Sequence, residues 1–235
     1  GSPMTSPRDN HEMIEAAPRL EWIQAITAGV DDLPLEAIAG RGILLTNGRG
    51  IHTIHMAEYA IAAMINLARG FHLMLRNQLR RKWDRSVSQT EICGATVGIL
   101  GLGAIGREIA RKAAFMGMRV IGVRRTADPL AHVAAVYGPE EMDLVFRQSD
   151  YVINLLPATP ATERLIDRRF FEVMKPTASF INLGRGQTVN ETDLIEALRQ
   201  RRIQALVTDV YETEPLPAES PLWEMENAIL TPHIG

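Results

Sequence analysis

The strongest constraint on the fold is an alternation of short apolar runs with amphipathic segments in the second half of the chain. Apolar runs of strand length occupy residues 96–100, 119–123, 151–156, 178–183, 205–210 and 228–230. Helical patterns separate most of them, at about 104–116, 140–148, 168–174 and 191–200. Such alternation is typical of βαβ units whose strands are buried on both faces. The sequence therefore predicts an α/β fold with a doubly wound parallel sheet.

The first 80 residues are less regular. Short strands are predicted at 20–26 and 43–46, and the tail of a helix at 11–16. One long helical pattern then runs from about residue 53 to 79, with an apolar stripe from Met56 to Met74 that is typical of a core or a subunit interface. We interpret the opening Gly1-Ser2-Pro3-Met4 as a cloning remnant.

Composition excludes several classes of protein. A net charge of −3 gives no electrostatic case for binding nucleic acid or an anionic membrane. A single cysteine excludes an intramolecular disulfide and fits a reducing, cytoplasmic location. There is no apolar run long enough to cross a membrane. His52 and His55 have no third ligand in the sequence, so we expect no metal site.

A glycine-rich loop directly follows the apolar run 96–100. Gly101, Gly103 and Gly106 have the spacing that permits a tight turn, close approach of a pyrophosphate and close helix–strand packing. The amino terminus of the following helix offers N–H donors and a positive dipole. In this strand–loop–helix context the motif predicts a dinucleotide-binding domain of Rossmann type.

The residues after the second strand indicate which dinucleotide is preferred. NAD sites place a carboxylate about 20 residues after the glycine loop to hold the ribose 2′-hydroxyl. Here Arg124, Arg125 and Thr126 follow the strand, and the first carboxylate is Asp128. Guanidinium groups and a hydroxyl can bind a 2′-phosphate, which a carboxylate would repel. We therefore predict a preference for NADP(H), with NAD(H) possible.

Three groups suited to chemistry follow later strands. Arg185 lies between two glycines after the run 178–183, and its planar fork can hold a carboxylate at two points. His233 follows the run 228–230 and can act as a general acid near neutral pH. Glu212 or Glu214 follows the run 205–210 and could orient the histidine. Together they predict hydride transfer to a carbonyl, with Arg185 binding substrate and His233 protonating the alkoxide.

These motifs resemble the D-isomer-specific 2-hydroxyacid dehydrogenases, the family of glyoxylate/hydroxypyruvate reductases and phosphoglycerate dehydrogenase. The resemblance covers the chain from about residue 12 to its end. The matching stretches are 27–31, 56–59, 101–106, 181–186, 209–217 and 231–235.

The resemblance implies functional residues that spacing alone leaves open. It implies Arg185, Glu214 and His233 as the catalytic trio, choosing Glu214 over Glu212. Asp209 would help to hold the nicotinamide carboxamide, and the backbone at Ala28 and Gly29 would meet the substrate carboxylate. The complete set of cofactor contacts that we expect is Gly101, Gly103, Ala104, Ile105, Gly106, Arg124, Arg125, Thr126, Pro157, Thr162, Leu183 and Asp209.

The resemblance also implies a domain organisation. Residues 1–48 would be part of a smaller, incomplete, flavodoxin-like substrate domain, and residues 49–235 the dinucleotide-binding domain with the long interdomain helix. Family members extend further at both ends, so we expect a truncated chain whose turnover is poor. A full-length protein would form a homodimer around the long helix.

The leading hypothesis is an NADP(H)-dependent reductase of small 2-oxo acids such as glyoxylate or hydroxypyruvate. Two alternatives stay open. One is a dinucleotide-sensing interaction protein similar to the C-terminal-binding corepressors, and the other is an inactive fragment of the dehydrogenase.

Overall fold

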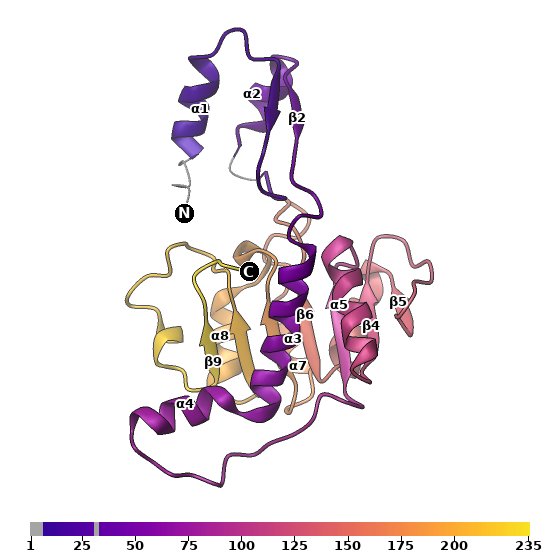
Figure 1. Ribbon diagram of the computed structural model, residues 1–235, viewed down its shortest axis with the longest axis vertical. Helices are drawn as coiled ribbons and strands as arrows, with labels where there is room; N and C mark the ends of the chain where they lie inside the picture. Colours follow the sequence, from indigo (N-terminus) through magenta and orange to yellow (C-terminus); the bar gives the residue numbers. More distant parts are fainter. Residues whose placement is uncertain (1–6, 31–32) are drawn as a thin grey trace. The chain divides into compact units, whose positions relative to one another are not determined.

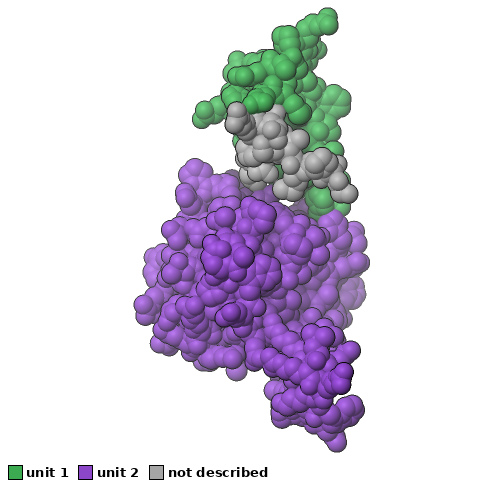
Figure 2. Space-filling view, turned by 90° about the vertical axis from the view of Figure 1, so that its left-hand side faces the viewer, with its two compact units in different colours: residues 1–52 green, residues 53–235 purple. Residues whose placement is uncertain are grey.

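The computed structural model describes residues 7–30 and 33–235. The cloning remnant expected at 1–4 and the end of the 27–31 motif, Asp31, lie outside these ranges. The chain divides into two compact units, residues 1–52 and 53–235, which Figure 2 colours separately. The sequence placed the boundary four residues earlier, after residue 48. No helix among the described residues is long and apolar enough to span a membrane.

Unit 1 is small. Its elements are α1 (Pro7–Glu15), β1 (Trp22–Gln24), α2 (Leu35–Gly40) and β2 (Leu44–Thr46). The two strands pair in parallel, and Ile14, Ile38 and Ile43 form a buried cluster of their own. The sequence predicted both strands but missed α2, which has only six residues and no side-chain cap at its start.

Unit 2 is a seven-stranded parallel sheet with the order β5-β4-β3-β6-β7-β8-β9 (Figure 1). The strands are β3 (Thr96–Leu100), β4 (Arg119–Val123), β5 (Ala135–Tyr137), β6 (Tyr151–Asn154), β7 (Ser179–Asn182), β8 (Ala205–Thr208) and β9 (Ala228–Leu230). The strand order reverses between β3 and β6, which is where a doubly wound sheet binds ligands at the carboxyl ends of its strands. The predicted doubly wound, Rossmann-type sheet is confirmed.

Helices cover both faces of this sheet. The helices of unit 2 are α3 (Thr53–Arg69), α4 (Phe71–Leu79), α5 (Ala104–Phe115), α6 (Met142–Gln148), α7 (Arg168–Val173) and α8 (Glu191–Arg199). Short 3₁₀ turns add η1 (Pro139–Glu141), η2 (Gly186–Thr188) and η3 (Pro221–Glu224).

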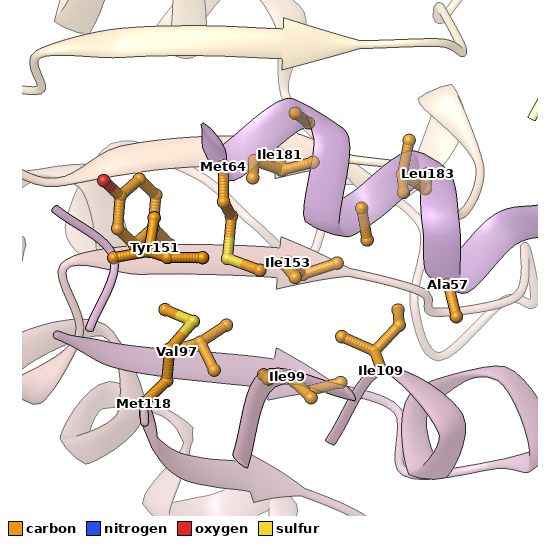
Figure 3. Close-up of a cluster of buried hydrophobic side chains, with 14 of the residues drawn as sticks. Ala57, Met64, Val97, Ile99, Ile109, Met118, Tyr151, Ile153, Ile181 and Leu183 are labelled. Carbon is orange, nitrogen blue, oxygen red and sulfur yellow. The ribbon is translucent and has the colours of Figure 1, made fainter. Parts of the chain in front are cut away.

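Alternate strand residues point to opposite faces of the sheet, so each strand contributes to two cores. Val97 and Ile99 join the core beneath α3 and α5, whose side chains are drawn in Figure 3. Leu100 joins the second core with residues of α6, α7 and α8. This double burial explains why the strands read as continuous apolar runs.

The long helix predicted at about 53–79 is wrong as a single element, because it breaks at Gly70 between α3 and α4. Gly70 takes a left-handed φ of 65°, and a Cβ built there would lie 2.6 Å from a methyl of Val87. Apolar periodicity continues across the break, so periodicity alone could not reveal it. The stripe is buried in α3, from Met56 to Ala68, whereas α4 has no buried residue.

Three strands end before the apolar runs that predicted them: β6 at Asn154 and β8 at Thr208 end two residues early, and β7 at Asn182 ends one residue early. Polar side chains turn the backbone there: the Asn154 Oδ1 accepts from the Leu156 amide at 3.1 Å, and the Thr208 hydroxyl donates to the Val210 carbonyl at 2.7 Å. The apolar residues that follow stay buried without continuing the sheet. The sequence also missed β5, a three-residue edge strand.

Candidate active site

The glycine loop joins β3 to α5 at the centre of the sheet. Gly101 has a left-handed φ of 105°, and its amide donates to the Val123 carbonyl of β4 at 3.0 Å. A Cβ on Gly106 would lie 2.2 Å from the carbonyl oxygen of Gly101, so a side chain there would push the helix away from the loop. Gly103 is the N-cap of α5 and makes no side-chain capping bond. The first turn of the helix therefore presents its amides at the strand-order reversal, where a pyrophosphate binds in such folds.

The neighbouring strand β4 ends beside this loop, because the two strands pair in parallel register from Thr96 and Arg119 onward. Arg124, Arg125 and Thr126 follow directly; Arg124 is half-buried and the other two are exposed. The first carboxylate after the strand is Asp128, which is also exposed. The segment that faces a ribose in a dinucleotide site is thus basic.

The hydroxyl of Thr162 stabilises the turn after β6. The side chain of Thr162 donates to the Pro157 carbonyl at 2.6 Å and accepts from the Thr159 amide at 2.9 Å. Both predicted contact residues of this segment, Pro157 and Thr162, therefore lie in one ordered turn. Leu183, predicted on the next strand, is 4% exposed and packs in the core, so only its backbone can face a ligand.

Arg185 follows β7 on a tightly packed backbone. Neither of the glycines that flank it, Gly184 and Gly186, has a left-handed φ. Gly186 is instead required by close approach, since a Cβ there would lie 1.9 Å from the Tyr211 backbone. The Thr188 hydroxyl donates to the Arg185 carbonyl at 2.6 Å, which fixes the loop that carries the half-buried guanidinium.

The segments after β8 and β9 bring a carboxylate and an imidazole together. Nδ1 of His233 lies 2.7 Å from Oε2 of Glu214. The other oxygen of Glu214 accepts from the Tyr211 amide at 3.0 Å, so the carboxylate is held from two sides. A proton on Nδ1 satisfies this pair and leaves Nε2 as the ring nitrogen that can meet a substrate.

The competing residue, Glu212, lies elsewhere. Its carboxylate is 3.5 Å from the Arg164 guanidinium, and its amide donates to Glu191 at 3.2 Å. Spacing along the chain could not separate Glu212 from Glu214, whereas the tertiary structure pairs only Glu214 with His233.

Asp209 is 2% exposed and already carries three hydrogen bonds. Its Oδ1 accepts from the Thr231 hydroxyl at 2.6 Å and the Ile234 amide at 3.0 Å, and its Oδ2 accepts from the Gly235 amide at 2.7 Å. Sequence reasoning assigned Asp209 to the cofactor and missed its bonds to the histidine loop. The position of Thr231 just after a strand was the available signal.

The remaining predicted residues lie in unit 1. The Asn47 amide donates to the Ala28 carbonyl at 2.8 Å, and the Thr27 hydroxyl donates to the Gly29 carbonyl at 2.7 Å. These bonds order the turn in which substrate contacts were predicted. Across the described residues, no group of three or more His, Cys, Asp or Glu side chains is placed to hold a metal ion.

Residues 61–235 match the model of the D-isomer specific 2-hydroxyacid dehydrogenase, NAD binding domain. The chain belongs to this family. The resemblance inferred from the motifs is thereby confirmed, and the sheet with its glycine loop is the family's nicotinamide dinucleotide-binding domain.

Individual relatives carry several names. The chain is 35% identical to a glyoxylate reductase from Pyrococcus furiosus, covering 99% of this chain and 71% of that protein. It is 34% identical to a D-3-phosphoglycerate dehydrogenase from Methanocaldococcus jannaschii, covering 95% of this chain but only 43% of that protein. An NADPH-dependent glyoxylate/hydroxypyruvate reductase from Sinorhizobium meliloti, solved in complex with NADP and sulfate, superposes with a TM-score of 0.85 at 30% identity; the match covers 98% of this chain and 73% of that one.

Proposed function

We propose that the protein reduces small 2-oxo acids to D-2-hydroxy acids with NADPH, glyoxylate and hydroxypyruvate being the expected substrates. The observation that carries this proposal is the pair of Glu214 and His233, 2.7 Å apart at the same edge of the sheet as the glycine loop. Family membership and the names of two relatives, one reducing glyoxylate and one glyoxylate or hydroxypyruvate, support the substrate class.

Each group would have one task in this reaction. The guanidinium of Arg185 would hold the substrate carboxylate in a bidentate pair and polarise the ketone. The hydride for the carbonyl carbon would come from the nicotinamide dinucleotide when it is bound. As the carbonyl electrons move onto oxygen, Nε2 of His233 would give up a proton to form the hydroxyl, and Glu214 would stabilise the imidazolium beforehand.

The preference for NADPH rests on Arg124, Arg125 and Thr126, which occupy the ribose-facing segment without a carboxylate before Asp128. The Sinorhizobium relative, described as NADPH-dependent, supports it. Arg124→Asp combined with Arg125→Ala should shift the ratio of kcat/KM values from NADPH toward NADH. An unchanged ratio would refute the assignment of a 2′-phosphate to this segment.

The test of the proposed function is NADPH and NADH oxidation by the full-length protein with a panel of 2-oxo acids. Turnover of glyoxylate or hydroxypyruvate is the expected result. The panel should include 3-phosphoglycerate with NAD⁺, because the 34% identity to a phosphoglycerate dehydrogenase makes that activity the second candidate. Tight cofactor binding without turnover of any acid would instead favour a dinucleotide-sensing protein.

We further infer that the full-length protein is a homodimer and that α4 contributes to the interface. Phe71, Leu75 and Leu79 recur every four residues and therefore line one face of this helix. All three are exposed, and α4 has no buried residue. An exposed apolar face of this kind is typical of a subunit contact.

A further inference from the structure

We propose that Tyr59 and Thr231 are positioning residues that, through Asp209, hold His233 in the geometry needed for proton transfer. The proposal rests on the proposed function insofar as His233 is taken as the proton donor. Its structural basis is a series of part-buried hydrogen bonds that runs from helix α3 to the loop after β9.

Asp209 accepts hydrogen bonds from the loop on both sides of His233, from a side-chain hydroxyl before it and from backbone amides after it. Thr231 is bound two residues before the histidine, and the amides of Ile234 and Gly235 are bound immediately after it. Between these points His233 takes a left-handed φ of 53°, a backbone conformation that residues other than glycine rarely adopt. Because the Asp209 carboxylate accepts three hydrogen bonds around His233, it stabilises the left-handed conformation of His233 relative to other backbone conformations of the loop.

The hydrogen bond between Tyr59 and Thr231 has a defined direction. The two hydroxyl oxygens are 2.6 Å apart, and by distance alone either could donate. The Thr231 hydroxyl has one proton, which it gives to Oδ1 of Asp209, because a carboxylate only accepts. Tyr59 must therefore donate to Thr231, and the order is Tyr59 to Thr231 to Asp209.

Tyr59, the first donor in this series of hydrogen bonds, lies far away in the sequence, 172 residues before Thr231. It lies on α3, whose neighbouring Met56 and Ala60 are buried in the core, so its hydroxyl is presented from a packed helix. Burial is the main cause that raises the pKa of Tyr59, and the Asp209 charge adds to it. The phenol therefore stays protonated and remains a donor across the working pH range.

A second tyrosine supports the same loop. The hydroxyl of Tyr211 donates to the Thr231 carbonyl at 2.9 Å, and burial raises its pKa as well. Thr231 is thus held by its side chain from Tyr59 and by its backbone from Tyr211. Removing the Tyr59 hydroxyl should loosen the loop without removing any group that would touch substrate.

The experiment compares Tyr59→Phe and Thr231→Val with wild type in the full-length protein. Thr231→Ser keeps the hydroxyl and should restore wild-type behaviour. Tyr151→Phe is the control, because Tyr151 is a buried tyrosine whose pKa is also raised by burial, but it begins β6 at the opposite, amino edge of the sheet. Two readouts are taken: hydrogen–deuterium exchange of the peptide that contains residues 231–235, and kcat and KM for 2-oxo acid reduction.

We expect Tyr59→Phe to speed exchange of this peptide and to lower kcat, each by about tenfold, the scale of one lost hydrogen bond. Thr231→Val loses two hydrogen bonds, to Tyr59 and to Asp209, and should have an effect at least as large. The KM for NADPH should stay near wild type, and Thr231→Ser and Tyr151→Phe should resemble wild type in both readouts. Wild-type exchange in Tyr59→Phe would overturn the proposal, and so would equal effects of Tyr151→Phe. If wild type reduces no acid, the proposed function fails. The exchange measurement still decides whether the hydrogen bonds from Tyr59 through Thr231 to Asp209 hold the loop.

Discussion

At the scale of single residues, the site depends on which of two glutamates faces the histidine. Glu214 is held between the Tyr211 amide and Nδ1 of His233, whereas Glu212 lies against Arg164. The pair makes a matched experiment, since both residues lie in the same loop and carry the same charge.

Glu214→Gln should lower kcat for 2-oxo acid reduction by about 100-fold, the range in which general acid–base groups contribute. The amide keeps the shape of the side chain but cannot stabilise the imidazolium. Glu212→Gln should leave kcat within about twofold. Steady-state kinetics with NADPH checks both, and equal losses in the two variants would contradict the assignment of Glu214.

His72 gives the fold a dependence on pH. Its Nδ1 is buried and has no hydrogen-bond partner among the described residues, and burial together with the charge of Arg76 lowers its pKa below 6.5. The unfolded chain therefore binds a proton at a higher pH than the folded chain does. Stability is unaffected above pH 6.5 and falls as the pH drops from 6.5 toward the lowered folded-state pKa.

His72→Phe should remove this acid-side loss, because phenylalanine cannot take up the proton in either state. The measurement is the melting temperature between pH 7.5 and pH 5, where the variant should show a smaller decrease than wild type. His132→Asn is the control, since His132 is exposed. Parallel curves for wild type and His72→Phe would refute the role of His72.

At the scale of elements, the break between α3 and α4 is decided by one glycine. Gly70 takes a left-handed φ, and its missing Cβ makes room for Val87. The buried stripe of α3 ends at this break, and the apolar face of α4 that follows it is exposed.

Gly70→Ala should lower the free energy of unfolding by about 1–3 kcal/mol, the cost of a left-handed non-glycine residue, and by more if Val87 cannot move away. Gly94→Ala separates the two effects. Gly94 also has a left-handed φ, of 79°, but a Cβ there meets nothing within 4 Å. Chemical denaturation should therefore show a larger loss for Gly70→Ala, and an equal loss would mean that the Val87 contact costs nothing.

At the scale of the whole molecule, the two compact units and the proposed dimer define the organisation. Unit 2 contains the glycine loop and the Glu214–His233 pair, and unit 1 contains the Ala28–Gly29 turn. The chain spans 43% of the Methanocaldococcus relative and 71% of the Pyrococcus relative.

The dimer is tested by placing charge on the apolar face of α4. Leu75→Glu with Leu79→Glu should convert the full-length protein to monomer in analytical ultracentrifugation, because two buried carboxylates at an apolar contact lack partners. Leu35→Glu on α2, also at an exposed leucine, is the control and should leave the oligomeric state unchanged. A dimer that persists in the double variant would exclude α4 from the interface.

The sequence by itself determined the parallel sheet, its glycine loop and the family. Strands that are buried on both faces must be apolar throughout, and the loop 101–106 must be rich in glycine to let one backbone segment approach another. Both features can therefore be recognised in the amino-acid sequence. Strand ends, β5 and the break at Gly70 were missed or misplaced, since each depends on a local hydrogen bond or on one contact with a distant residue.

Only the tertiary structure decided how the candidate site is assembled. Glu214 and Glu212 have the same chemistry and nearly the same position along the chain; the family resemblance favoured Glu214, and the partners of the two side chains in space give the physical reason. The bonds that join Tyr59, Thr231 and Asp209 connect segments up to 172 residues apart. Periodicity reports which side of an element is buried, and the site depends on which atoms of different elements lie within hydrogen-bond distance.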